Sequence, residues 1–315
     1  MPNHYSAHLP TQDWVDQRKN YIGGSDVAAI LGVSAYATPL QVWMRKKGLI
    51  PPVDQTPIME FGHVFEPVMA DYFTEKTGLK VRNINKTFKS AQYDFLRANI
   101  DRQIVSNGDQ GTGVLELKTT TSYRLKNLDT PYPEEWDYQI QHYLGITGYQ
   151  YAYLMIYERD TCTFHEPVCI KRNDRWIRQT TERLVEWWQK HMLGYGHRPK
   201  PINGEDMLLL YPDSKDGSVV EATPTHYEKY TKLLQVRSRM EELAVVEEYL
   251  KNYFKDTLKD AERMVVAGRT MLSWKSTQSN RFDTTAFRKA HPDLYKTFVK
   301  SVPARRFTVT KQKGD

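Results

Sequence analysis

Asp101 and the run Glu116-Leu117-Lys118 have the residue types that metal-dependent phosphodiester cleavage requires. In an extended strand alternate side chains share a face, so Glu116 and Lys118 should point the same way while Leu117 points into the core. Asp101 and Glu116 would then hold a hard divalent ion through oxygen, and Lys118 would lie beside the attacking water or the scissile phosphate. Because so short a pattern is common, its surroundings must support this interpretation.

Two helical segments also aim polar groups inward. Glu66 shares an apolar stripe with Met69 and Phe73, and Gln139 shares one with Tyr143. A carboxylate on an apolar stripe is costly unless it is paired or binds a metal, so a salt bridge to Arg or Lys is the competing account of Glu66. An inward Gln would orient a water or contact a phosphate, or it would satisfy a backbone group.

The elements that position these residues can be read from hydrophobic periodicity and turn residues. Strands are expected at 80–89, 95–105, 113–120, 150–158 and 162–171. Helices are expected at 26–31 with Ser25 as N-cap, from Thr38 to Gly48, and at 59–77, 134–147 and 174–193. A further short helix is predicted from Thr11, and a turn at Ser106-Asn107-Gly108-Asp109. This order predicts the α/β class, with a central mixed sheet flanked by helices.

The character of the chain changes near residues 200–222, and we predict domains at 1–204 and 205–315. The second would be a C-terminal helical arm followed by a small α/β module. Thr225-x-x-Glu228 predicts the start of a long helix that runs to about 262 and has a short apolar seam near a 3.5-residue repeat. This seam indicates a helical hairpin arm, an oligomer contact or packing on the helix's own domain. A strand pair at 264–274 and 305–311, enclosing a helix at 284–299, would complete the module.

Composition bounds the class of protein. The chain has 315 residues, of which 40% are hydrophobic, and seven tryptophans, which favours a packed globular protein. No stretch reaches the roughly 18 apolar residues of a membrane span, and the first residues lack the apolar run of a signal peptide. We therefore expect no membrane association and a cytoplasmic location. Cys162 and Cys169 fit no common metal motif and are expected to be free thiols.

Charge is unevenly distributed. Residues 263–315 contain twelve Lys/Arg against three Asp/Glu, a net charge of +9, whereas the rest of the chain has a net charge of −3. Such a basic end indicates a surface for a polyanion or an acidic partner, although a solvated tail is an equally reasonable interpretation.

A set of motifs in fixed order resembles a known family. The motifs are Arg18, GGSD at 23–26, GxxxEP at 62–67, NID at 99–101, ELK at 116–118 and YQIQ at 138–141. Together they resemble the YqaJ-type viral recombinases, which are related to the alkaline exonuclease of phage lambda and belong to the PD-(D/E)xK nucleases. The resemblance covers roughly residues 10–200 and implies a restriction-endonuclease-like core.

The resemblance also implies roles for individual residues. Asp101, Glu116 and the backbone carbonyl of Leu117 would bind Mg²⁺ or Mn²⁺, and Lys118 would position or deprotonate the attacking water. Glu66 would bind a second ion or support the first. Gln139 would help to hold the lysine and the water.

Arg18 and Ser25 match residues that grip the terminal 5′-phosphate in the lambda-like enzymes. An Arg beside the start of a short helix is independently reasonable as a phosphate pocket. Asn99 replaces a residue that is often a small hydroxyl in relatives, so we include it in this pocket but expect its phosphate contacts to differ. The extension from 205 onward is absent from the compact lambda-like enzymes. Two cysteines are too few for the related four-cysteine iron–sulfur nucleases.

The activity that the resemblance implies is 5′→3′ digestion of double-stranded DNA ends, which leaves a 3′ single strand for recombination by annealing. The expected partners are a single-strand DNA annealing protein and further copies of the chain in a ring-like homo-oligomer, in a bacterial host cell and of phage or prophage origin. The alternatives are an endonuclease of the same fold, of restriction or junction-resolving type, and a non-catalytic DNA-end-binding protein.

Overall fold

The computed structural model describes residues 17–105, 111–126, 128–194, 196–300 and 305–310. The chain forms two compact units that divide between Leu210 and Tyr211, close to the domain boundary predicted at 204/205. The predicted helix from Thr11 and the predicted turn at 106–109 lie outside the described residues.

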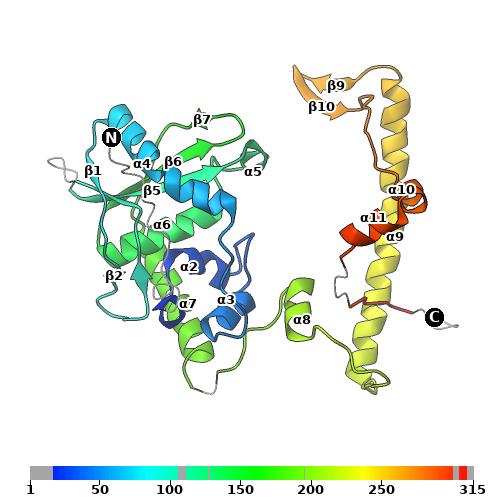
Figure 1. Ribbon diagram of the computed structural model, residues 1–315, viewed down its shortest axis with the longest axis horizontal. Coiled ribbons are helices and arrows are strands. Elements are labelled where there is room, and N and C mark those ends of the chain that lie inside the picture. The colour runs from blue at the N-terminus through cyan, green and yellow to red at the C-terminus, as the bar shows by residue number, and fades with distance from the viewer. Residues whose placement is uncertain (1–16, 106–110, 127, 195, 301–304, 311–315) are drawn as a thin grey trace. The chain divides into compact units, whose positions relative to one another are not determined.

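The first unit is built on a mixed β-sheet (Figure 1). Its described strands are β1 (Val81–Arg82), β4 (Arg102–Ile104), β5 (Gly113–Thr120), β6 (Tyr151–Glu158), β7 (Thr163–Phe164) and β8 (Val168–Lys171). They follow the order β1-β4-β5-β6-β7, and β8 also pairs with β6. The β4/β5 pair is antiparallel and the β5/β6 pair is parallel. The helix α6 (Glu134–Thr147) supplies the crossover that a parallel pair requires.

Helices cover both faces of this sheet. Along β5, Leu115 and Leu117 pack with Met69 and Phe73 of α4 (Pro57–Thr77). Val114, on the opposite face, packs with residues of α6 that include Ile140 and Leu144. A central mixed sheet flanked by helices is the predicted α/β fold class, which is therefore confirmed.

The ranges predicted for β5, β6, α6 and α7 (Asp174–His191) agree with the structure within two residues at each end. The strand predicted at 95–105 is wrong in extent, because it divides into β3 (Arg97–Ala98) and β4. Between them the carboxylate of Asp101 accepts a hydrogen bond from the Leu117 N–H at 2.8 Å, where a backbone carbonyl would continue a ladder.

Two other predicted strands are also divided. The range 80–89 separates into β1 and β2 (Phe88–Lys89), and β2 pairs with β3 in a sheet of its own. The range 162–171 separates into β7 and β8 around Pro167, which has no N–H to donate to a ladder.

Short helices complete the first unit. They are α2 (Gly24–Ile30), α3 (Pro39–Lys46), α5 (Ser122–Leu125) and α8 (Gly204–Leu210), and a 3-10 turn, η1, covers Arg18–Asn20. The residue that caps α2 is Gly23, so the prediction of Ser25 as its N-cap is wrong, and Ser25 lies in the first turn.

Asp206 anchors α8 within the first unit. Its side chain is 0% exposed and accepts hydrogen bonds from the Thr38 hydroxyl at 2.6 Å and from the Ile202 N–H at 2.9 Å. Thr38 is itself the N-cap of α3.

The second unit contains the long helix α9 (Pro224–Leu258), a hairpin of β9 (Arg263–Val266) and β10 (Arg269–Ser273), and the short helices α10 (Thr284–Ala290) and α11 (Pro292–Phe298). Thr223 caps α9, so the predicted start at Thr225 is two residues late. Apolar residues of the predicted seam, including Val236, Met240 and Leu243, are exposed.

The predicted pairing of 264–274 with 305–311 is wrong. The first range folds on itself around Ala267-Gly268, which both have positive φ as a tight hairpin turn requires, and residues 305–310 form no strand. The helix predicted at 284–299 is interrupted before Pro292. Among the described residues, no helix is both long and apolar enough to span a membrane.

Replacing Asp206 with Ala should destabilise the first unit, because the buried Thr38 hydroxyl and the Ile202 N–H both lose a charged acceptor. We expect the free energy of unfolding to fall by about 3 kcal/mol. Urea unfolding followed by tryptophan fluorescence will measure it, since six of the seven tryptophans precede residue 211. The exposed neighbour Glu205 provides the control Glu205→Ala. A loss below about 1 kcal/mol for Asp206→Ala would contradict this role.

Candidate active site

Asp101 and Glu116 form a carboxylate pair at the edge between β4 and β5. Arg102 pairs with Leu115, and continuing this antiparallel register brings Asp101 opposite Glu116 on the face that α6 covers. Glu116 is 1% exposed. Asp101 is held in place by the hydrogen bond that its Oδ2 accepts from the Leu117 N–H. The tertiary structure thus brings the two predicted metal ligands together.

Lys118 and Gln139 complete a hydrogen-bonded group on this face. Lys118 Nζ donates to Glu116 Oε1 at 2.5 Å and to Gln139 Oε1 at 3.0 Å. Gln139, which comes from α6, donates in turn to Glu116 Oε1 at 2.7 Å and to the Tyr143 hydroxyl at 2.9 Å. The amide of Gln139 therefore fixes both the lysine and the carboxylate.

Glu66 reaches this region from α4, on the other face of the sheet. Its carboxylate pairs with Arg102 Nη1 at 3.2 Å and with His63 Nδ1 at 3.1 Å. The pairing with Arg102 is the salt bridge that the sequence offered as the competing explanation of an inward-facing Glu66. Glu66 is nevertheless close enough to act electrostatically on Asp101 and Glu116. The pairing with Glu66 also raises the pKa of His63.

Negative charge is concentrated at this site. Burial, followed by repulsion from Glu116 and Glu66, raises the pKa of Asp101 well above its usual value. Burial also raises the pKa of Glu116, against the opposing effect of Lys118. Burial alone would lower the pKa of Lys118, but the carboxylates of Glu116 and Asp101 outweigh it and raise that pKa. A bound cation would relieve the repulsion between the acids.

One oxygen of the pair has no protein partner. Glu116 Oε2 is buried without a hydrogen bond from any described residue. Such an orphaned acceptor in a native fold calls for a water or an ion. The N–H and C=O of one strand residue point to the same edge of the strand. Since the Leu117 N–H donates to Asp101, the Leu117 carbonyl also faces the side of Asp101. The last residue of β5 that pairs with β4 is Leu115, so this carbonyl lies beyond the β4 ladder. Asp101, Glu116 and this carbonyl therefore fit a hard cation.

The number of protein ligands is small. The described residues contain no group of three or more His, Cys, Asp or Glu side chains that could hold a metal ion. Two carboxylates and one carbonyl, with water in the other positions, are the coordination that Mg²⁺ usually accepts in proteins. Glu66, paired with Arg102, does not join the two acids as a third ligand.

The predicted phosphate residues lie on η1, α2 and the segment before β4. Arg18 Nη2 donates to Ser25 Oγ at 2.6 Å. Asn99 donates from Nδ2 to the Tyr21 hydroxyl at 3.4 Å. The structure therefore joins Arg18 to Ser25, while Asn99 lies beside the neighbouring Tyr21.

Two residues under this pocket were not predicted. Asp26 Oδ2 accepts from Lys46 Nζ at 2.9 Å and from the Gly23 N–H at 2.9 Å. Burial tends to raise the pKa of Asp26, but Lys46 and Arg18 lower it further than burial raises it, so Asp26 is ionised. Asp26 belongs to the GGSD motif and could have been found there, whereas Lys46 lies on α3 with no local signal.

Tyr143 connects the pocket to the carboxylate pair. A Cβ on Gly24 would lie 2.4 Å from its ring, so α2 and α6 approach this closely only because residue 24 is a glycine. The Tyr143 hydroxyl accepts the hydrogen bond from Gln139. Burial, and then the charges of Glu116 and Asp101, raise the pKa of Tyr143 well above its usual value, so it stays a neutral phenol.

Comparison with known proteins identifies similar chains. A family model described as the YqaJ-like viral recombinase domain matches residues 13–150. Over 314 residues the chain is 30% identical to the uncharacterized protein YqaJ of Bacillus subtilis, covering 96% of this chain and 95% of that protein. This relative therefore shares most of the second unit as well as the first.

Two solved structures are similar over the larger part of their own length. An alkaline exonuclease from Laribacter hongkongensis is 19% identical with a TM-score of 0.46, covering 56% of this chain and 90% of that one. A phage-related exonuclease from Haemophilus somnus 129PT is 12% identical with a TM-score of 0.41, covering 53% and 91% respectively.

Metal affinity should increase with pH. Carboxylates bind a cation in their ionised form, and the pKa of Asp101 is raised, so protons compete with the metal below that pKa. We expect Mn²⁺ to bind the full chain at least about tenfold more tightly at about pH 8 than at about pH 5.5, by isothermal titration calorimetry.

Asp101→Asn should weaken Mn²⁺ binding and flatten this pH dependence. The exposed Asp71, on the same unit, provides the control Asp71→Asn, which should bind as the parent chain does. Equal Mn²⁺ affinity at both pH values in the parent chain would contradict the site.

Proposed function

The chain belongs to the family of YqaJ-like viral recombinase proteins, and from that premise we propose that it is a metal-dependent nuclease that digests the 5′ strand from the ends of duplex DNA. The observation that carries this proposal is the group formed by the buried Glu116 and the partly buried Asp101 and Lys118, with an orphaned oxygen on Glu116. The 3′ single strand that remains would be the product used for recombination.

Asp101, Glu116 and the Leu117 carbonyl would hold Mg²⁺ or Mn²⁺. When bound, this cation supplies positive charge that stabilises the negative charge developing on the scissile phosphate. Water would attack phosphorus, forming one O–P bond while the bond to the leaving sugar oxygen breaks; the attacking water would lose a proton to solvent, and the leaving oxygen would take one up.

Lys118 would act as a charged donor. The adjacent carboxylates raise its pKa, which favours the ammonium form at neutral pH and a role in positioning the water or a phosphate oxygen over a role as the base. Gln139 would hold Lys118 Nζ in position through the hydrogen bond that its Oε1 accepts from Nζ at 3.0 Å. Glu66 would support the site through Arg102, which is next to Asp101 in sequence.

The pocket of Arg18 and Ser25 would bind the terminal 5′-phosphate. The Arg18 side chain is about one third exposed and already donates to Ser25, and a phosphate oxygen would take up further donors of the guanidinium. Asn99 would line the same pocket beside Tyr21. The contact of Gly24 with Tyr143 supports a fixed spacing between this pocket and the carboxylate pair, as stepwise digestion from an end requires.

We further propose that the protein acts as a homo-oligomer, in a ring-like arrangement around DNA, together with a single-strand DNA annealing protein. The apolar residues exposed along α9 support a contact between copies, because exposed apolar surface of this kind is commonly covered in an assembly. This part of the proposal is independent of the chemistry.

Lys118→Ala and Asp101→Asn should each reduce Mg²⁺-dependent digestion of linear duplex DNA by about 100-fold or more. The first removes a positive charge beside the reacting phosphate, and the second removes the charge of a metal ligand. Release of labelled nucleotides measures the rate, and duplex binding without divalent metal should be retained. The exposed Lys80 provides the control Lys80→Ala, with unchanged digestion expected. Undiminished digestion by Lys118→Ala and Asp101→Asn would refute the site.

Strand-specific labels test recognition of the end. Linear duplexes should lose the 5′ strand progressively, and faster with a 5′-phosphate than with a 5′-hydroxyl. Arg18→Ala should remove this preference, whereas Arg18→Lys should retain part of it, because both charged side chains attract phosphate but only Arg binds it in a bidentate manner. Nicking of covalently closed DNA would favour the endonuclease alternative, and digestion of the 3′ strand would overturn the polarity.

A further inference from the structure

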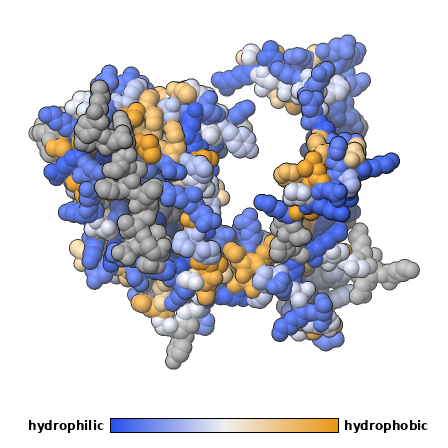
Figure 2. Space-filling view, viewed as in Figure 1, coloured by the Kyte–Doolittle hydropathy of each residue, from blue (hydrophilic) through white to orange (hydrophobic). Residues whose placement is uncertain are grey.

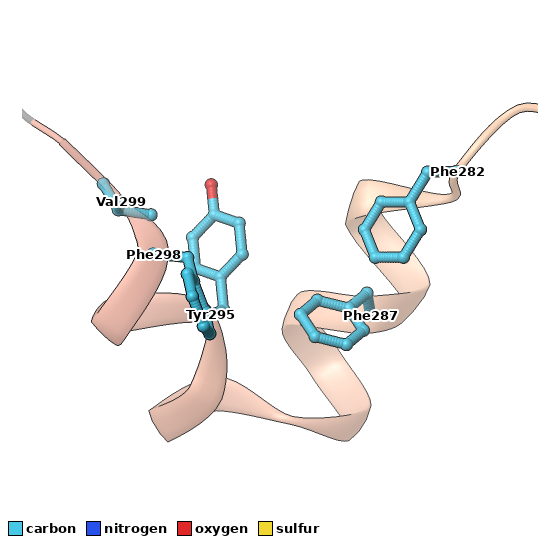
Figure 3. Close-up of a pocket in the computed structure, with 5 residues that line it drawn as sticks. All are labelled: Phe282, Phe287, Tyr295, Phe298 and Val299. Atoms are coloured by element: carbon cyan, nitrogen blue, oxygen red, sulfur yellow. The ribbon is translucent and has the colours of Figure 1, made fainter. Parts of the chain in front are cut away.

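The end of the second unit carries a cluster of aromatic side chains. Phe282, Phe287, Tyr295, Phe298 and Val299 line a hollow of about 330 Å³. Figure 3 shows the rings at 282 and 287 facing those of α11 across this space. The centroids of Phe282 and Phe287 are 4.9 Å apart, with the rings tilted by 58°.

These rings do not form a buried core. Phe282 is 71% exposed and Phe298 is 76% exposed. No residue of α10 or α11, both described in full, is buried. Figure 2 shows hydrophobic residues at the surface of this unit next to strongly hydrophilic ones. Large aromatic side chains left open in this way mark a binding surface.

The segment of chain that carries the cluster is strongly basic. Residues 281–310 contain seven Lys/Arg and two Asp/Glu. Both acids are already engaged, because Asp283 Oδ1 accepts from the Ala286 N–H at 2.8 Å and Asp293 pairs with Lys296 at 3.8 Å. The Arg288 guanidinium lies 4.8 Å from the centre of the Tyr295 ring. The uncompensated charge is therefore positive, next to open rings.

We propose that this surface, defined by Phe282, Phe287, Tyr295 and Phe298 with their basic neighbours, binds single-stranded DNA. Aromatic faces stack with unpaired bases of any sequence, while Lys and Arg contact the backbone phosphates. Duplex DNA would match the charge but not the rings, because its bases are already stacked on one another. An apolar protein partner would match the rings but not the excess positive charge.

This inference goes beyond the proposed nuclease activity and does not depend on it. The 3′ strand that digestion would leave is a ligand of this class. The surface would then retain the product strand on the protein.

The test measures the affinity of the full chain for a labelled single-stranded oligonucleotide by fluorescence anisotropy, in EDTA so that no metal-dependent digestion occurs. The double variant Phe282→Ala/Phe298→Ala should bind at least about tenfold more weakly, because each stacked base contributes to affinity. Both side chains are exposed, so the variant should fold, and circular dichroism checks this. The affinity for a blunt duplex should change much less.

Tyr36 of the first unit is 71% exposed and provides the matched control Tyr36→Ala, which should bind as the parent chain does. Absence of binding by the parent chain, or equal affinity in the double variant, would overturn the inference. A third contradicting outcome is a double variant that no longer self-associates in analytical ultracentrifugation but keeps its affinity for the oligonucleotide. The surface would then contact a second copy of the chain. Digestion of duplex DNA is assayed separately, so a failure here is distinguishable from failure of the nuclease proposal.

Discussion

Two carboxylates held beside each other, the buried Glu116 and the partly buried Asp101, are the constraint on which the rest of the first unit depends. Ionised acids at Asp101 and Glu116 repel each other and lose hydration, so the fold must supply compensating donors. The Leu117 N–H, the Lys118 ammonium and the Gln139 amide supply them. These donors leave Glu116 Oε2 without a partner, so the compensation is incomplete. This buried carboxylate oxygen is still able to accept a cation.

This constraint explains why β5 has a helix on each face. Its odd-numbered residues Leu115 and Leu117 complete an apolar layer with α4, while Glu116 and Lys118 face α6, which provides Gln139 and Tyr143. Because Gly24 has no side chain, α2 packs closely against Tyr143 of α6. This contact places Ser25, and Arg18 which donates to it, next to the helix that supplies Gln139. Arg18, Ser25 and the carboxylate pair are thus connected through packed elements.

The second unit has a different physical character. Its long helix buries little besides Leu258, and α10 and α11 leave their aromatic rings open. A unit that buries so little apolar surface gains little stability from its own core. Its positive charge indicates a polyanion, and its rings indicate unpaired bases.

The sequence by itself determined the central features that depend on local spacing. The alternation along β5 and the helical stripe of α6 follow from periods of 2.0 and 3.6 residues, which need no knowledge of distant neighbours. Asp101, Glu116 and Lys118 are singled out by their residue types and by the ordered motifs around them. Only the tertiary structure decided which partners these residues meet. The pairing of Glu66 with Arg102, the support of Asp26 by Lys46, the division of the strands around Asp101 and the local hairpin in place of a pairing with 305–311 all depend on contacts across the chain. Such contacts arise from the register and packing of whole elements, which no local pattern encodes.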